Sequence, residues 1–203
     1  MARTRNQQEY DTARTRLLDS GLALIRSQSY AAIGINDILK RCNIPKGSFY
    51  HYFASKEEFG LAVLGHYHQQ QLVAARELLQ DQSKPAYDRL LNFFQGAGDD
   101  YRQREYGDGC LMCNLSTELG DSHQKFQQQL QQSWSELTQV IAECLAEVNK
   151  TDLNLDHLTD QEAADWLLNT WSGALVRMKA ERNCQPLDLF FKSVFKLTGD
   201  TKA

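Results

Sequence analysis

Apolar side chains recur every three or four residues along most of this chain, which is the spacing of one face of an α-helix. The clearest run lies between residues 122 and 148, with intervals of 4, 4, 3, 4, 3 and 4: Phe126, Leu130, Trp134, Leu137, Ile141, Cys144 and Val148. A second run lies between residues 159 and 182: Ala163, Leu167, Trp171, Ala174, Leu175 and Met178. Glycine and proline, at 12 and 3 of 203 residues, rarely interrupt the pattern. The pattern predicts an all-α protein.

Turn residues and helix caps divide the chain into about nine helices. The expected helices cover residues 11–27, 36–41, 46–52, 55–80, 86–104, 110–120, 122–148, 159–182 and 187–197, with the last one ending at Gly199. Ser55 with Glu58, and Thr159 with Glu162, have the spacing of capping boxes. A polar arm that contains Arg3 and Arg5 precedes the first helix. It is interpreted either as an arm that follows a groove or as a free tail.

Two short helices joined by a tight turn stand out between residues 35 and 59. Asn43 in the turn tolerates a left-handed backbone, and Pro45 can open the second helix because its missing N–H is not needed there. The second helix, residues 46–52, carries three aromatic rings and a histidine but almost no aliphatic side chain. We expect Phe49 and Phe53 to face the core. The remaining surface is typical of a helix offered to a groove rather than of a core helix.

The segment PKGSFYHYFASKEEF resembles the recognition-helix signature of the TetR family of transcriptional regulators, and the close resemblance covers residues 11–64. Pro45 stands where the family commonly has serine, and Cys42 where alanine is usual. The resemblance implies a helix-turn-helix three-helix head at residues 1–55 that binds double-stranded operator DNA. The helical ligand-binding and dimerisation body would cover residues 56–203. Repression rather than activation is likewise a family expectation.

The resemblance also implies which side chains contact DNA: Asn36, Lys46, Gly47, Ser48, Tyr50, His51, Tyr52 and Lys56. Tyr50 and His51 would contact phosphates or thymine methyl groups, and Ser48 would lie near base edges. Gly47 has no side chain, so its backbone can come close to the DNA. Lys56 would bind phosphate together with the amides at the start of the next helix.

Charge is distributed unevenly, although the net charge is −4. Residues 1–56 contain nine Lys/Arg and four Asp/Glu, whereas residues 57–203 contain thirteen and twenty-two. A basic head on an acidic body fits a module that binds phosphates, fused to a part that does not. The chain has neither an apolar run long enough to span a membrane nor the apolar core of a secretory signal, so we expect a cytoplasmic protein.

Five unevenly spaced cysteines do not suggest a disulfide framework. Cys110 and Cys113 form a CxxC, but no βαβ pattern surrounds it, and neither a second CxxC nor clustered histidines complete a zinc site. We therefore expect no metal and no cofactor. At positions i and i+3 of a helix the pair could bridge, although a bridge would constrain little beyond its own turn. Ordinary buried cysteines are the other interpretation.

The segment GCLMCNLSTELGD resembles a part of TetR-family regulators that respond to reactive electrophiles or unsaturated small acids, in which a cysteine at the position of Cys110 is the sensing thiol. Cys110 in the first turn of its helix would favour the thiolate, whereas Glu105 and Asp108 would oppose it. Lys179 could approach and lower the Cys110 pKa. The residues expected to line or sense a small-molecule effector are Tyr101, Cys110, Cys113, Phe126, Trp134, Trp171, Met178 and Lys179.

The helices predicted at 122–148 and 159–182 resemble the pair that forms a four-helix dimer interface in the family, so we expect a homodimer. Small residues would let these helices approach closely: Ala163, Ala164, Gly173 and Ala174. Two alternatives to a cysteine-based sensor stay open. One is a regulator of the same fold that binds its drug or metabolite non-covalently. The other is an enzyme with Cys110 as nucleophile and His123 as a partner, which would leave the recognition helix unexplained.

Overall fold

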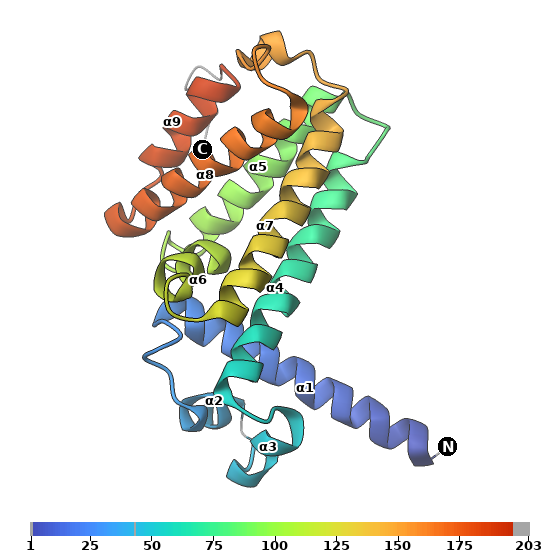
Figure 1. The fold of residues 1–203 in the computed structure, drawn as a ribbon, viewed down its shortest axis with the longest axis vertical. Helices are drawn as coiled ribbons and strands as arrows, with labels where there is room; N and C mark the ends of the chain where they lie inside the picture. The colour runs from blue at the N-terminus through green and yellow to red at the C-terminus, as the bar shows by residue number, and fades with distance from the viewer. Residues whose placement is uncertain (1, 43, 197–203) are drawn as a thin grey trace.

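The computed structural model describes residues 2–42 and 44–196, and every regular element in them is helical (Figure 1). The α-helices are α1 (Ala2–Ser27), α2 (Ile35–Cys42), α3 (Phe49–Tyr52), α4 (Lys56–Leu79), α5 (Ala86–Gln103), α6 (Leu111–Leu119), α7 (Gln124–Leu145), α8 (Asp160–Glu181) and α9 (Gln185–Val194). Two 3₁₀ turns, η1 (Lys46–Ser48) and η2 (Lys150–Leu153), complete the order. The predicted all-α architecture is confirmed for these residues.

The recognition element lies at one end of the molecule, and α4 runs from it along the whole body (Figure 1). A small aromatic core holds this end together: the ring centroids of Phe49, Phe53 and Phe59 lie 5.1–5.7 Å apart, and all three rings are buried. Phe49 and Phe53 therefore face inward, as the sequence predicts. A Cβ at Gly21 would come within 2.3 Å of the Phe59 ring, so this glycine lets α1 approach α4 closely.

In the body, α7 lies beside α4 and is also packed against α5, α6 and α8 (Figure 1). Most of its apolar residues from Phe126 to Leu145 are buried within the chain, and Trp134 is half-buried. α8 continues this layer and packs against α9, where Trp171 meets Phe190 at 5.0 Å and Phe191 at 5.8 Å between ring centroids. None of the helices in the described part of the chain is long and apolar enough to cross a membrane.

Several helix ends differ from the sequence prediction. α1 begins at Ala2, so the expected arm is helical, because no glycine or proline separates it from the rest of α1; the side chains of Arg3 and Arg5 lie outside the described residues. The recognition element starts as a 3₁₀ turn in which the Ser48 N–H bonds to the Pro45 carbonyl at 2.9 Å. The last helix ends at Val194, before the expected Leu197, because Phe195 and Lys196 after it are not helical; Gly199 lies outside the described residues.

The two predicted capping boxes have different outcomes. At Thr159 both reciprocal hydrogen bonds to Glu162 are present. At Ser55 the hydroxyl accepts from the Glu58 N–H at 3.0 Å, but the Glu58 carboxylate turns back to the N–H of Ala54, at 2.8 Å, instead of that of Ser55. The prediction for α4 was therefore wrong by one residue. The first turn is still capped, because the Glu58 N–H has a partner in the Ser55 hydroxyl.

Candidate DNA-binding and sensing sites

The recognition element presents a polar and aromatic surface outside the small core. Tyr50 is 65% exposed, and His51 and Gly47 are also exposed, while Ser48 and Tyr52 are half-buried. A Cβ at Gly47 would have no neighbour within 4 Å, so nothing in the protein itself requires glycine there. Asn36 is exposed on α2, and the side chain of Lys46 lies outside the described residues. The expected DNA-facing residues with described side chains thus all have some solvent access.

Two residues near this surface have roles that the sequence pattern did not indicate. Tyr10 of α1 stacks on Tyr52, with ring centroids 4.8 Å apart, and meets the edge of His51 at 5.4 Å. Lys56 lies over the Tyr30 ring at 4.6 Å, and its Nζ donates to the Ala31 carbonyl at 3.4 Å. Burial lowers the pKa of this lysine. Lys56 therefore also fastens the loop before α2.

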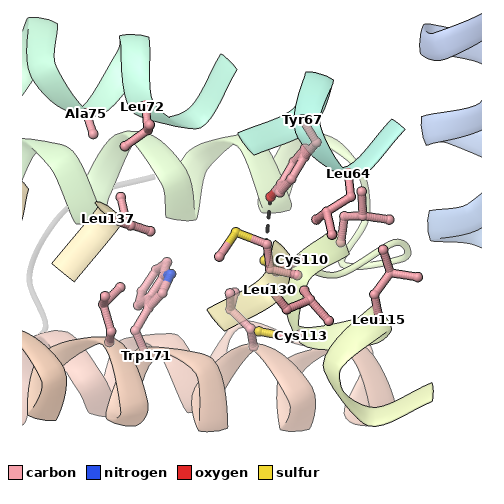
Figure 2. Close-up of a cluster of buried hydrophobic side chains, with 14 of the residues drawn as sticks. Leu64, Tyr67, Leu72, Ala75, Cys110, Cys113, Leu115, Leu130, Leu137 and Trp171 are labelled. Atoms are coloured by element: carbon pink, nitrogen blue, oxygen red, sulfur yellow. Dashed lines mark hydrogen bonds between the residues drawn. The ribbon is translucent and has the colours of Figure 1, made fainter. Parts of the chain in front are cut away.

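Cys110 is the residue that precedes α6 and occupies its N-cap position, with an extended backbone at φ −81° and ψ 132°. It was expected in the first turn and lies one residue before it. Its sulfur accepts a hydrogen bond from the Tyr67 hydroxyl of α4 at 3.5 Å, as Figure 2 shows. Cys110, Cys113 and Tyr67 are all buried.

Hydrogen bonds to its sulfur lower the pKa of Cys110 to about 6. The strongest comes from the Cys113 thiol, and others come from the backbone N–H groups of Cys113 and Met112 and from Tyr67; burial opposes them. The same arrangement raises the pKa of Cys113, because its proton is held by the Cys110 sulfur and the site is dry. Of the two thiols, Cys110 is therefore the one that ionises more readily.

Both ends of α6 are tied to the helices of the recognition end. Before α6, the Gly109 carbonyl accepts two hydrogen bonds from the Arg26 guanidinium of α1, at 3.0 Å and 2.8 Å. In the last turn of α6, the Glu118 carboxylate accepts from the backbone N–H of Tyr30 at 3.0 Å and of Ala31 at 2.6 Å. Together with Tyr67, these bonds connect α6 to α1, to α4 and to the loop that leads into α2.

A cavity of about 350 Å³ opens beside Cys113, between α6, α7 and α8. Its walls are partly apolar, with Trp134, Leu168 and Val176, and partly polar, with Ser116, Ser172 and Asp165 among others. The Trp134 indole N–H donates to the Ser116 hydroxyl at 3.2 Å, which fixes the ring at the wall. The space suits a small, mostly apolar molecule.

Family models match both parts of the chain. The model described as "Bacterial regulatory proteins, tetR family" matches residues 17–63, and "Tetracyclin repressor-like, C-terminal domain" matches residues 86–194. The second match alone covers more than half of the chain.

This chain belongs to the TetR family. It is accordingly a DNA-binding transcriptional regulator, as the sequence resemblance implied.

Relatives and solved structures of the TetR family match this chain over almost its whole length. The HTH-type transcriptional repressor DhaR of Mycobacterium sp. (strain GP1) is 32% identical over 90% of both chains. The HTH-type transcriptional repressor NemR of Escherichia coli (strain K12) is 29% identical over 89% of this chain and 90% of that one. The crystal structure of a regulatory protein TetR from Rhodobacter sphaeroides superposes with a TM-score of 0.84 at 28% identity, covering 91% of this chain and 97% of that chain.

The residues expected to face an effector fall into separate places in this TetR-family fold. Cys110, Cys113 and Tyr101 lie together with Tyr67, and Trp134 lines the cavity beside Cys113. Phe126 instead packs on Tyr30, with centroids 5.1 Å apart, at the junction with the recognition end. Trp171 belongs to the aromatic cluster with α9, and Met178 is completely buried.

Lys179 lies near the thiol site, and its effect on the Cys110 pKa stays a prediction. Its Cδ would be 3.1 Å from a Cβ at Gly109, yet its Nζ donates to the Asn114 side chain at 3.3 Å. The groups that lower the Cys110 pKa are its sulfur and hydroxyl neighbours and the backbone amides. Tyr67, 43 residues away in sequence, was not identified because no local pattern connects it to Cys110.

Proposed function

We propose that this TetR-family regulator is a homodimeric repressor, released from a palindromic operator when a small electrophile alkylates Cys110. The observation that supports this is the combination at one sulfur: a thiolate near neutral pH, held by Tyr67 of α4, at the start of a helix tied to the recognition end. The DhaR and NemR relatives are named as repressors, which supports repression for this chain. A regulator of chromosomal DNA would work in the cytoplasm.

The chemistry is a conjugate addition to an unsaturated carbonyl compound such as a small enal or a quinone. The Cys110 thiolate forms a carbon–sulfur bond to the β-carbon, and the resulting enolate takes a proton from water. The sulfur then carries no charge and is a poor acceptor for the Tyr67 hydroxyl. The adduct also needs room, which the cavity beside Cys113 provides only after a shift at the start of α6.

A shift of α6 would reach the DNA-binding end through bonds that already exist. Arg26 holds the Gly109 carbonyl to α1, and Glu118 holds the loop residues Tyr30 and Ala31 just before α2. α4 itself carries Tyr67 at mid-length and the recognition element before its first turn. Alkylation would release the operator because the two states of α6 have different affinity for it.

On the DNA side, the head comprises residues 1–55 and the body residues 56–203. The contacts to operator DNA come from Asn36, Lys46, Gly47, Ser48, Tyr50, His51, Tyr52 and Lys56. Two heads in a dimer would bind half-sites about one helical turn, roughly 34 Å, apart or a small multiple of it. Phosphate contacts would give salt-dependent affinity, and base contacts would give the sequence preference.

α8 offers the surface for dimerisation. Of the two long helices expected at the interface, α7 packs against four other helices and exposes mainly polar residues. α8 has an exposed stripe at intervals of three and four residues: Trp166, Asn169, Gly173, Val176 and Ala180. Trp166 and Val176 are 41% and 53% exposed. Three of the four small residues expected to let helices approach, Ala163, Ala164 and Ala174, are buried inside the chain, and only Gly173 faces outward.

A regulator that binds its ligand non-covalently is the second candidate, and the cavity beside Cys113 is the observation that favours it. The cysteine-enzyme alternative has less support. His123 contacts the neighbouring Ser122 hydroxyl at 2.8 Å and the rings of Tyr30 and Phe126, and the hydrogen-bond partners described for Cys110 include no histidine. We therefore assign no enzymatic activity.

The experiment is operator release measured by fluorescence anisotropy. The protein is bound to labelled DNA from its own upstream region, and a small enal is added with and without excess thiol. We expect release from the wild type but not from Cys110→Ser, with mass spectrometry showing one adduct on Cys110. Cys144→Ser is the matched control, because Cys144 is a buried cysteine that donates to the Ala86 carbonyl in the body. Equal release of the operator by Cys110→Ser would mean that the effector is sensed at a non-covalent ligand site instead.

A further inference from the structure

The two thiols at the start of α6 differ in position as well as in protonation. Cys110 is the N-cap residue, and its carbonyl accepts the first helical hydrogen bond, from Asn114 N at 3.0 Å. Cys113 is the third residue of the helix and is buried as Cys110 is. Figure 2 shows both side chains among the same buried residues. The two thiols thus lie one helical turn apart in the same buried site.

The separation of the two residues suits a disulfide. Residues at i and i+3 of an α-helix have Cα atoms about 5 Å apart. Disulfides in proteins need Cα separations of roughly 4.4–6.8 Å. Since the extended backbone of Cys110 lies outside the helix, side-chain rotation can bring the sulfurs together without unwinding α6. A bond between the two sulfurs would therefore need little movement of the backbone.

We propose that Cys110 and Cys113 are a redox-active pair, in which a hydroperoxide oxidises Cys110 and Cys113 resolves the product as an intramolecular disulfide. In the first step the Cys110 thiolate attacks one peroxide oxygen, the O–O bond breaks, and sulfenic acid and hydroxide form. In the second step the Cys113 sulfur attacks the Cys110 sulfur, the S–O bond breaks, and water leaves with the thiol proton. Sulfur loses two electrons in total, and the peroxide gains them.

The neighbours of Cys113 support its role as the resolving thiol. Ser172 of α8 lines the same cavity as Cys113, and its hydroxyl lowers the Cys113 pKa, which favours the thiolate form that attacks. The remaining cysteines lie on other elements. Cys144 contacts Ala86, Cys184 contacts the Asp188 carboxylate at 3.0 Å, and Cys42 contacts the Arg16 carbonyl at 3.7 Å. Cys113 is the cysteine placed against Cys110.

Disulfide formation would change α6 as alkylation does but would be reversible. The Cys110 sulfur loses its negative charge and with it the strong acceptor for Tyr67. This consequence at the operator rests on the proposed function, whereas the chemistry of the pair does not. The disulfide would also protect Cys110, since an unresolved sulfenic acid oxidises further to sulfinic acid, which thiols do not reduce.

The test treats the reduced full-length protein with about a tenfold excess of hydrogen peroxide, and maps thiols by alkylation and peptide mass. The wild type should lose two hydrogen atoms in the peptide that holds Cys110 and Cys113, and dithiothreitol should restore both thiols. Cys113→Ser should instead gain two oxygen atoms at Cys110, and dithiothreitol should not reverse this. Cys113→Ala repeats the experiment without a hydroxyl, and thermal unfolding shows that each variant is folded.

Cys144→Ser is the matched control and should form the disulfide as the wild type does. Both cysteines remaining alkylatable in the oxidised wild type would overturn the proposal, as would a Cys113→Ser protein whose Cys110 recovers fully with dithiothreitol. Enal-driven operator release by the wild type is measured in parallel. Disulfide formation without operator release by the enal would retain the redox pair and overturn alkylation sensing. Operator release by the enal without disulfide formation would overturn only the redox pair.

Discussion

The hydroxyl of Tyr67 joins the sulfur of Cys110 to the helix leading to the DNA-binding end. In Tyr67→Phe the ring remains and this donor is lost, so the pKa of Cys110 rises from about 6. A hydrogen bond to a charged acceptor is worth roughly 1.5–3 kcal/mol, so the rate of alkylation at about pH 6.5 should fall by about tenfold. The pH profile of alkylation with iodoacetamide measures this.

Tyr87→Phe is the control for that profile. It also removes a single phenol hydroxyl, one that donates to the Phe195 carbonyl at 2.9 Å on the far side of the body. Its profile should overlay that of the wild type. If the pH midpoint of alkylation were the same in Tyr67→Phe and the wild type, the Cys113 thiol and the helix amides would lower the Cys110 pKa without Tyr67.

Gly47 offers a test of the DNA-binding surface that leaves folding intact. An added Cβ meets nothing within 4 Å in the protein, so Gly47→Ala should not destabilise it and can add up to about 1 kcal/mol of stability. If the backbone at Gly47 lies against DNA, the methyl group should raise the operator Kd by about tenfold, or ~1.4 kcal/mol. Gly96→Ala in α5, where the Cβ is equally free, should leave the Kd unchanged. Equal Kd values for both variants would place Gly47 away from the DNA.

At the scale of elements, local patterns predicted most helices but not their partners. The apolar intervals of α7 and α8 and the cap at Thr159 were sufficient to predict these helices, because each pattern depends on residues close together in sequence. The thiolate site depends on long-range contacts instead, since Tyr67 and Cys110 are 43 positions apart. Phe126 has the same spacing as Trp134 on α7, yet only Trp134 reaches the cavity, because periodicity gives a face and not a position along the helix.

Glu118 is the group through which the end of α6 holds the loop before α2. Glu118→Gln removes the negative charge that two backbone N–H groups share, which should cost about 1–3 kcal/mol of unfolding free energy. With α6 less firmly connected, alkylation of Cys110 should proceed normally while the ratio of operator Kd after and before alkylation falls several-fold. Chemical unfolding, adduct mass and anisotropy give the three values.

The control for this connection is Glu143→Gln, an exposed position on α7 whose carboxylate contacts Gln80 and Gln139 within the body. It should keep the wild-type Kd ratio. A Glu118→Gln protein that also kept that ratio would show that the signal leaves α6 by Arg26 or Tyr67 alone.

For the whole molecule, the question is which surface joins two copies. The sequence pointed equally to the two long helices, because both carry apolar stripes. Packing distinguishes the two helices. The apolar stripe of α7 packs mostly inside the chain. α8 has one stripe buried and a second one, which includes Trp166 and Val176, exposed. An apolar stripe at helical spacing on the outside of a folded chain is typical of a helix–helix interface.

Val176→Glu tests whether the exposed stripe of α8 forms the dimer interface, and Val73→Glu is the control at a similar exposure. Val176 on α8 is 53% exposed and Val73 on α4 is 46% exposed, so neither glutamate should disturb the monomer core. At a dimer interface, a buried unpaired charge costs several kcal/mol, so Val176→Glu should raise the dimer dissociation constant by about 100-fold or more. Sedimentation velocity should then find monomers, and operator affinity should fall because the two heads no longer bind as one unit. Val73→Glu should remain a dimer with wild-type operator affinity, and dimers of Val176→Glu at micromolar concentration would place the interface away from this stripe.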